Sequence, residues 1–505
     1  MFEQKKKMEN INKMEVNKDF SFLKLSRKIM IEWFSTSTVH GLSNIMRIKN
    51  IFLKVIWIIC FLISAIWCLF SSIRLFSTYY AYPSYVSTLI VQESPSVFPA
   101  VTICNMKLVN KTKNMQFAYT KSMPFSHMFK ANISIINQFT PYELIHLTKQ
   151  KIIENINDNR VLNGTSRKQI GYQIEDMLVS CYFNFKQCFA NDFTYSFDYL
   201  NGNCYTFNSG KPNSKGKKSR ILNVTNSDSE YSGLVLELFV GNPDVETFYE
   251  FNDGILVSIH NQSSRPFQSE SKGLKAAAGA ETDFKIERNF INKLPPPHGD
   301  CENESKNPEL SRYMNELGLN SYSQSLCIQV CQQRESIKLC NCSNPLWPKF
   351  DNRTKYCSFE DTSLNQNCGY IFAQMNRNML GSCFKYCPSD CESFEYDIST
   401  HTALYPNKFY AETVLSRYAK QRGLNVSTEN IYKSFAKINI NYEKMQYKTI
   451  LHKVSIKPEE LFSNFGGTLS LFLGISFLSF IEIFNLGFNL GSLLLDYVKN
   501  RYKSN

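Results

Sequence analysis

The sequence predicts a membrane protein with two transmembrane helices and a large, disulfide-rich α+β domain between them. Two long apolar segments lie at about 51–70 and at 466–484 of the 505 residues. Each is close to the roughly 20 residues that a helix needs to cross a bilayer. Fourteen of the 16 cysteines, and every N-glycosylation sequon, fall between the two segments. A dense, even set of cysteines beside sequons is typical of an exported, oxidised domain.

The composition indicates that most of the chain lies in water. Hydrophobic residues make up 43% and charged residues 20% of the sequence, which excludes a transporter buried wholly in the membrane. The formal charge is +12, but the basic residues are scattered rather than gathered in one stripe, so we expect no nucleic-acid partner. The sequence has no recognisable motif for a catalytic site or a cofactor, and we expect no enzyme activity.

The region around the first apolar segment predicts the orientation. We expect a cytosolic tail at 1–50 and the first transmembrane helix at 51–75. A signal peptide is the alternative, but the segment lies far into the chain and lacks a small-residue cleavage site. Basic residues in the tail favour the cytosolic side: Lys5, Lys6, Lys7, Lys24, Arg27, Lys28, Arg47 and Lys49. Two spans then place both termini in the cytoplasm and the protein in the plasma membrane.

The segment 76–460 is predicted to be the extracellular domain. Alternating apolar residues at 97–105, 233–239 and 255–260 indicate strands of a half-buried sheet, and 438–454 indicates returning strands. Small residues between 269 and 283 indicate an exposed loop.

A cysteine-rich part of this domain spans about 301–400. Four-residue spacing places Cys327 with Cys331, and Cys383 with Cys387 and Cys391, on single helix faces, so two helices could be cross-linked. Zinc is the competing interpretation. The spacing of the cysteines suits a zinc finger poorly and the compartment is oxidising, so we expect disulfides and no metal site.

The second apolar segment combines small residues with a charge. Gly466, Ser470 and Gly474 recur every fourth residue, which lets a neighbouring helix approach one face closely. Glu482 places a carboxylate at membrane depth, where it is costly unless it faces water or a partner. A single-pass anchor is the alternative, but an anchor does not require the small-residue face. We expect the second transmembrane helix at 461–493 and a cytosolic tail at 494–505.

Several short blocks carry a family resemblance. They are the triplet Gly474-Ile475-Ser476 followed by Glu482, the pair His40-Gly41, the run Val97-Phe98-Pro99-Ala100-Val101-Thr102-Ile103-Cys104-Asn105, and the block 202–208. In these blocks the chain resembles the degenerin/epithelial sodium channel/acid-sensing ion channel superfamily. The resemblance covers 40–484. It implies a trimeric channel in which each subunit has two membrane helices beneath palm, finger and thumb regions.

The resemblance also implies roles for residues near the membrane. Gly474, Ile475 and Ser476 would form the ion filter at a break in the second helix, where backbone carbonyls can face ions. Glu482 would contribute to an acidic ring that draws cations. Residues implied to take part in gating are His40, Gly41, Tyr82, His298 and Ser463. His298 stands where the family usually has an aromatic residue, so it is either a tolerated substitute or a group whose titration tunes gating.

The family pattern implies a disulfide for every cysteine between the spans. The pairs are Cys104 with Cys204, Cys181 with Cys188, Cys301 with Cys391, Cys327 with Cys387, Cys331 with Cys383, Cys340 with Cys368, and Cys342 with Cys357. The candidate glycosylation sites are Asn110, Asn132, Asn163, Asn223, Asn261, Asn303, Asn341, Asn352 and Asn425.

The resemblance leads to a functional hypothesis. We expect a subunit of an amiloride-sensitive sodium channel, assembled with identical or homologous subunits in the lipid membrane and gated through its extracellular domain by a short neuropeptide. Gating by protons, by force or constitutive opening is the alternative within the family, as is calcium permeation, because Ile475 is bulkier than the residue usual there. Alternatives outside it are an ATP-gated trimer, an ectoenzyme and a non-conducting accessory or receptor subunit.

Overall fold

The computed structural model describes residues 24–110, 149, 152–153, 156, 164–198, 200–211, 220–227, 232–243, 252–264, 266, 273–304, 307–316, 322–343, 347, 354–355, 377–424, 426–427 and 429–502. The chain divides into two compact units. Met1–Tyr85 and Val454–Asn505 form the first, which we call the helical unit, and Val86–Lys453 form the second, which we call the β-rich unit.

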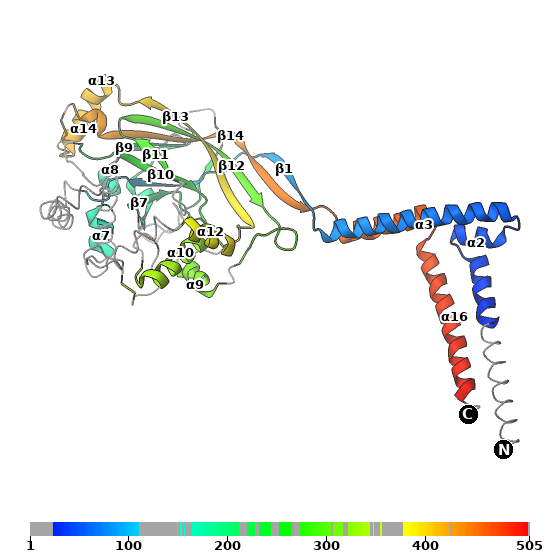
Figure 1. Ribbon diagram of the computed structural model, residues 1–505. Helices are drawn as coiled ribbons and strands as arrows, with labels where there is room; N and C mark the ends of the chain where they lie inside the picture. Colours follow the sequence, from blue (N-terminus) through cyan, green and yellow to red (C-terminus); the bar gives the residue numbers. More distant parts are fainter. Residues whose placement is uncertain are drawn as a thin grey trace, which may run out of the picture. The chain divides into compact units, whose positions relative to one another are not determined.

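Among its described residues, the helical unit contains a helical stretch at 24–36 and four further helices. These four are α2 (His40–Arg47), α3 (Ile51–Tyr80), α15 (Pro458–Leu473) and α16 (Phe477–Tyr502), shown in Figure 1. Two stretches, Ile51–Tyr80 and Phe477–Asp496, are long and apolar enough to cross a membrane. The first helix extends to Tyr80, beyond the end expected at residue 75. The second apolar segment is divided between α15 and α16 rather than forming one continuous helix.

Local sequence explains how these helices begin and pack. Asn50 caps α3, because its side-chain oxygen accepts a hydrogen bond from the backbone N–H of Phe52 at 3.0 Å. Pro458 occupies the first turn of α15, where its missing N–H costs nothing. The rings of Phe76 and Phe465 meet edge to face, with centroids 5.3 Å apart, where α3 packs against α15.

The β-rich unit is built on a seven-stranded sheet with the order β13-β12-β14-β9-β4-β5, to which β1 is added beside β14. The strands are β1 (Ser84–Gln92), β4 (Leu178–Phe183), β5 (Lys186–Gln187), β9 (Leu234–Phe239), β12 (Ala280–Asn292), β13 (Glu392–Leu404) and β14 (Phe435–Val454). β12 and β14 run parallel, and a bulge sets Glu287 opposite 443–446. Gly233 permits a close approach beside β9, because a Cβ there would lie 1.9 Å from the Ile440 carbonyl oxygen.

A five-stranded antiparallel sheet packs with the first sheet around one hydrophobic core. Its order is β11 (Leu274–Ala277), β10 (Gly254–His260), β3 (Ala100–Asn105), β7 (Gly202–Phe207) and β6 (Phe193–Asp198), and β2 (Ser96–Val97) pairs separately with β8 (Asn223–Val224). Every residue of β3 and of β7 is buried, so both faces of this sheet are covered at its centre.

The prediction of an exposed loop between 269 and 283 is wrong for the described residues, 273–283. Residues 274–277 form β11, which turns directly into β12, and Ala276 is fully buried. Ala276 is closely packed, since a Cβ on Gly254 would lie 2.4 Å from the Ala276 carbonyl oxygen, whereas its neighbour Ala277 is exposed. Sequence composition alone does not distinguish a crowded strand from an open loop.

Short helices surround the sheets. They are α7 (Gly164–Ile170), α8 (Ile174–Met177), η1 (Ala190–Asp192), α9 (Pro308–Glu316), α10 (Gln324–Cys340), α12 (Arg377–Tyr386), α13 (Lys408–Tyr410), η3 (Ala411–Leu415), α14 (Ser416–Gln421) and η4 (Ile431–Lys433). α9, α10 and α12 gather on one side of the β-rich unit in Figure 1.

Five disulfides form among the described residues, each with the partner that the family resemblance implied. The pairs are Cys104–Cys204, Cys181–Cys188, Cys301–Cys391, Cys327–Cys387 and Cys331–Cys383. The last two join α10 to α12 as neighbouring rungs. Cys340 and Cys342 are also disulfide-bonded, and their expected partners Cys368 and Cys357 lie outside the described residues. Among the described cysteines, Cys60 and Cys68 of α3 are free.

Candidate functional site

The triplet Gly474-Ile475-Ser476 interrupts the second membrane segment. Gly474 ends α15 in a left-handed conformation, with φ 66° and ψ 21°, which a glycine adopts at little cost. The Gly474 N–H donates to the Ser470 carbonyl at 3.0 Å, and the Ile475 N–H donates to the Leu469 carbonyl at 3.4 Å. The first of these bonds ends the helix as in the αL cap motif, and the chain runs without helical structure until α16 begins at Phe477.

Ser479 secures the start of the helix that follows. Its side-chain oxygen accepts a hydrogen bond from the Ser476 N–H at 3.0 Å, and its own N–H donates to the Ser476 carbonyl at 2.9 Å. Paired bonds of this kind satisfy N–H groups that the first turn of a helix leaves without partners. Ser479 is fully buried. The last residue of the triplet is therefore held by a hydroxyl one turn further along α16.

Residues 33–38, which we call the N-terminal segment, hydrogen-bond to the Ser479 hydroxyl and to Glu482. The hydroxyl oxygens of Thr38 and Ser479 are 2.7 Å apart. The Glu482 Oε2 atom accepts two bonds from Thr38, from the backbone N–H at 3.0 Å and from the hydroxyl at 3.1 Å. The Trp33 indole N–H donates to the Glu482 backbone carbonyl at 3.1 Å. A continuous set of hydrogen bonds thus links the segment before α2 to the triplet.

A glycine brings α2 close to the first long helix. A Cβ added to Gly41 would lie 2.4 Å from the ring of Phe61, so only glycine allows this approach without movement of the ring. Before it, the buried Ser37 hydroxyl oxygen accepts a hydrogen bond from the Val39 N–H at 3.2 Å, which turns the chain into α2. The structure therefore assigns Gly41 a packing role. The backbone of His40 begins α2.

The Glu482 carboxylate is not a free charge within this chain. Its Oε2 atom is already bound by Thr38, and among the described residues no basic side chain pairs with it. Charge on a carboxylate strengthens the hydrogen bonds that it accepts. Glu482 thus holds the N-terminal segment, a role that the acidic-ring expectation did not include.

The remaining gating candidates lie apart from this network. Ser463 is exposed on α15. Tyr82 follows α3 with φ 50°, and its N–H donates to the Tyr79 carbonyl at 3.0 Å. His298 follows three prolines in the β-rich unit and is partly buried. The family resemblance implies that the loop carrying His298 contacts Tyr82. Because Tyr82 and His298 belong to different units, this contact stays a prediction.

The candidate glycosylation sites differ in exposure. Asn223, Asn303 and Asn341 are exposed and Asn261 is partly exposed. Asn110 is 4% exposed, which argues against a glycan at that sequon. Four further sequons lie outside the described residues: Asn132, Asn163, Asn352 and Asn425.

Sequence reasoning assigned no role to Trp33, Thr38 or Ser479. One signal was available, because four consecutive hydroxyl residues, 35–38, end two positions before His40. A second was the spacing of Ser476 and Ser479, which suits a helix start. Neither signal identifies the partner, since Thr38 and Glu482 are 444 residues apart in the sequence.

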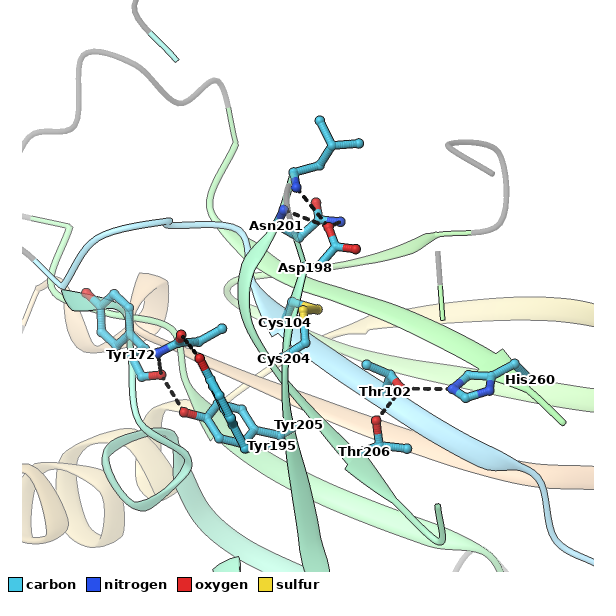
Figure 2. Close-up of a disulfide and its surroundings, with 12 residues drawn as sticks. Thr102, Cys104, Tyr172, Tyr195, Asp198, Asn201, Cys204, Tyr205, Thr206 and His260 are labelled. Carbon is cyan, nitrogen blue, oxygen red and sulfur yellow. Dashed lines mark hydrogen bonds between the residues drawn. A yellow bond between two sulfur atoms is a disulfide. The ribbon is translucent and has the colours of Figure 1, made fainter. Parts of the chain in front are cut away.

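A second polar group, in the β-rich unit, encloses a histidine. Figure 2 shows Thr102 between Thr206 and His260, with hydroxyl oxygens 2.7 Å apart and the histidine Nε2 atom 2.8 Å from Thr102. The Nδ1 atom is 2.8 Å from the Asn261 carbonyl, which can only accept, so Nδ1 carries a proton. Burial, with a smaller effect from nearby Lys211, lowers the pKa of His260 to about 4. This histidine is therefore neutral at physiological pH.

Comparisons with known proteins agree over most of the chain. The family model for the amiloride-sensitive sodium channel matches residues 33–486. Acid-sensing ion channel 1 of Gallus gallus is 25% identical over 493 residues, covering 94% of this chain and 86% of the relative. Epithelial sodium channel subunit gamma of Xenopus laevis is 26% identical over 320 residues, covering 63% of this chain and 46% of the relative.

A further relative is epithelial sodium channel subunit beta of Homo sapiens. It is 26% identical over 330 residues, covering 65% of this chain and 49% of the relative. The chain therefore spans about half the length of these two epithelial subunits and most of the length of the acid-sensing channel.

Proposed function

Because the chain belongs to the amiloride-sensitive sodium channel family, we propose that it is one subunit of a trimeric, amiloride-sensitive cation channel in the plasma membrane. Membership of this family makes it a channel protein rather than an enzyme. Its partners would be two identical or homologous subunits, as the word subunit in the names of two relatives suggests. Both termini would lie in the cytoplasm, and the β-rich unit outside the cell.

The observation that carries this proposal is the interruption between α15 and α16. A break inside a membrane-spanning segment leaves backbone groups without helical partners, and such backbone is tolerated only where it lines a cavity or is buried in protein. Gly474, Ile475 and Ser476 occupy that break. Three copies around one axis would present polar backbone to passing cations, which supports their assignment as the filter.

Beneath the filter, the N-terminal segment would act as part of the gate. Thr38 contacts Ser479 and Glu482, and Ser479 in turn holds Ser476. Movement of the segment before α2 would therefore take the Thr38 hydroxyl away from Ser479, the residue whose side chain holds the last filter residue. The His40-Gly41 pair is separated from Thr38 only by Val39, so it would take part by positioning this segment.

The stimulus would act through the β-rich unit. β1 begins at Ser84, four residues after α3 ends at Tyr80, and β14 ends at Val454, four residues before α15 begins at Pro458. Such short connections can pass strand movements to both helices. We propose a short neuropeptide as the ligand, with sodium as the main permeant ion.

Expression of the full chain in oocytes tests the proposal. We expect a cation current that amiloride blocks and an amidated peptide evokes, with acid steps as the comparison stimulus. Reversal potentials in sodium-only and calcium-only solutions would separate sodium selectivity from calcium permeation.

A matched pair of variants locates the filter. Ile475→Ala should change the ratio of sodium to calcium permeability, because the middle of the triplet gains width. Ile481→Ala, an exposed isoleucine of α16 outside the triplet, should leave that ratio unchanged. Silence at the cell surface, even with homologous subunits co-expressed, would contradict the channel assignment and favour an accessory role.

A further inference from the structure

The cytosolic-side half of α16 contains a short internal repeat. Residues 484–491 read Phe-Asn-Leu-Gly twice, and the two asparagines, Asn485 and Asn489, are four residues apart. Further polar residues follow at intervals of three or four in both directions, at Glu482, Ser492 and Asp496. At about 100° of rotation per residue, all five fall within an arc of about 80° on a helix. We call this set the polar stripe.

Apart from Glu482, which Thr38 and Trp33 bind, the polar stripe lies away from the covered side of α16. The buried Ser479 and the partly buried Leu486, Leu490 and Leu493 mark the covered side of α16, which is centred about one quarter-turn away. Asn485 and Asn489 are exposed, and within the described part of the chain neither amide has a hydrogen-bond partner. The stripe is therefore exposed from Asn485 to Asp496, whereas Glu482 at its start is partly buried and bound by Thr38.

Exposed amides at this depth need water or a polar partner. Both lie within Phe477–Asp496, the part of α16 that is apolar enough to cross a membrane. An amide left without partners in hydrocarbon costs several kcal/mol. Polar residues inside membrane segments accordingly face a bundle interior or a water-filled path. The apolar remainder of the helix, including Phe484 and Phe488, is suited to lipid or to other helices.

We propose that Asn485 and Asn489 line the cytosolic half of the ion path and contact the permeating cations. This inference rests on the proposed channel function. Between the carboxylates of Glu482 and Asp496, the path would carry neutral amide oxygens over two helical turns. Amide oxygens solvate a monovalent cation without holding it, whereas a ring of carboxylates at the same level would also retain divalent cations. The two asparagines would therefore keep cytosolic Mg²⁺ from blocking the path.

Cysteine substitution tests the water-lined face. Asn485→Cys and Asn489→Cys would be made in a background with Cys60→Ser and Cys68→Ala, which removes both free thiols of the described chain. A charged, membrane-impermeant methanethiosulfonate applied to the cytosolic side of excised patches should reduce the current of both variants. Gly487→Cys, on the opposite side of α16, is the matched control and should react at least tenfold more slowly. Equal rates at the three positions would overturn the proposal.

A second readout does not depend on current. Inside-out membrane vesicles holding the same variants would be treated with an impermeant maleimide, and modification would be measured as a gel shift. Labelling of Asn485→Cys and Asn489→Cys above Gly487→Cys supports a water-lined stripe even if no current is recorded, in which case the channel function alone fails. Absence of this difference overturns the stripe whether or not the chain conducts.

A charge substitution tests the consequence for divalent ions. Asn489→Asp should lower the half-blocking concentration of cytosolic Mg²⁺ by about tenfold, which corresponds to about 1.4 kcal/mol of added attraction. Asn489→Gln, which keeps an amide, should leave the block as in the native chain. Unchanged block in Asn489→Asp would contradict contact between this position and the permeating ions.

Discussion

Two carboxylates of this protein, one in each unit, have hydroxyl groups as partners but differ in how firmly they are held. In the β-rich unit, Glu237 accepts bonds from three side chains: Tyr405 at 2.7 Å, Tyr410 at 2.8 Å and Ser180 at 2.6 Å. In the helical unit, Glu482 accepts two longer bonds, both from Thr38. Neither pairs with a basic side chain among the described residues.

This difference indicates that Glu237 stabilises the fold of its unit, whereas the contact between Glu482 and the N-terminal segment can be broken. Glu237 lies on β9 and joins β4 to the segment after β13, so both of its oxygens are used by distant parts of one unit. Burial and the neighbouring Glu237 raise the pKa of Tyr405, which therefore stays protonated and continues to donate. Glu482 uses one oxygen to hold one segment, whose departure would leave the rest of the helical unit intact.

The largest expected effect is on the Glu237 centre. Glu237→Ala removes the acceptor for three hydroxyl groups of partly buried residues, so we expect a loss of about 3 kcal/mol in the free energy of unfolding. Thermal unfolding of the detergent-solubilised full chain would measure it. Glu237→Gln, which keeps one oxygen acceptor, should lose less. Equal stability of the native and alanine chains would show that the centre is not structural.

Acid should weaken the β-rich unit through His260. Its pKa is about 4 in the folded chain and 6.5 unfolded, so the unfolded state binds the proton more tightly. The stability from neutral His260 is complete above pH 6.5 and is lost as the pH falls through about 4. We expect this residue to lower the free energy of unfolding by about 2 kcal/mol between pH 7.5 and 5.

Replacement of the histidine isolates this contribution. His260→Gln cannot titrate, so its thermal midpoint should fall less between pH 7.5 and 5 than that of the native chain. Parallel falls in the two proteins would exclude His260 as the source of acid sensitivity.

A smaller effect is expected where Gly41 meets Phe61. Gly41→Ala should cost about 1.5 kcal/mol through overpacking and displace the segment that carries Thr38. Phe61→Leu in the same chain should relieve most of the cost. Peptide-evoked currents and thermal midpoints of the native chain, the two single variants and the double variant would give a double-mutant cycle. Additive losses would mean that the two residues do not interact.

The smallest expected effect tests the contact between Thr38 and Glu482 directly. Thr38→Val removes the hydroxyl but keeps the backbone N–H, so we expect a change of about 1 kcal/mol, or about fivefold, in the gating equilibrium with unchanged surface expression. Thr36→Val is the control, because the Thr36 hydroxyl donates to backbone carbonyls of the preceding turn, those of Glu32 at 2.9 Å and Trp33 at 3.4 Å. The open probability at a fixed stimulus measures the change in the gating equilibrium for each variant. Equal changes in Thr38→Val and Thr36→Val would show that Thr38 has no specific role in gating.

The sequence by itself determined the features that depend on local composition. Segment length and apolarity predicted the two spans, the distribution of cysteines predicted an oxidised domain, and Gly474 permits the left-handed turn at which the second segment breaks. The short blocks were sufficient to identify the family and, through it, five disulfide pairs that form in the structure.

Only the tertiary structure decided which polar groups meet. Nothing near Thr38 or Glu237 in the sequence indicates their partners, and alanines that suggested a loop at 276–278 border a crowded sheet edge. The physical reason is that hydrogen bonds and close packing join atoms brought together by the whole fold, whereas periodicity and composition report only on a residue's neighbours along the chain.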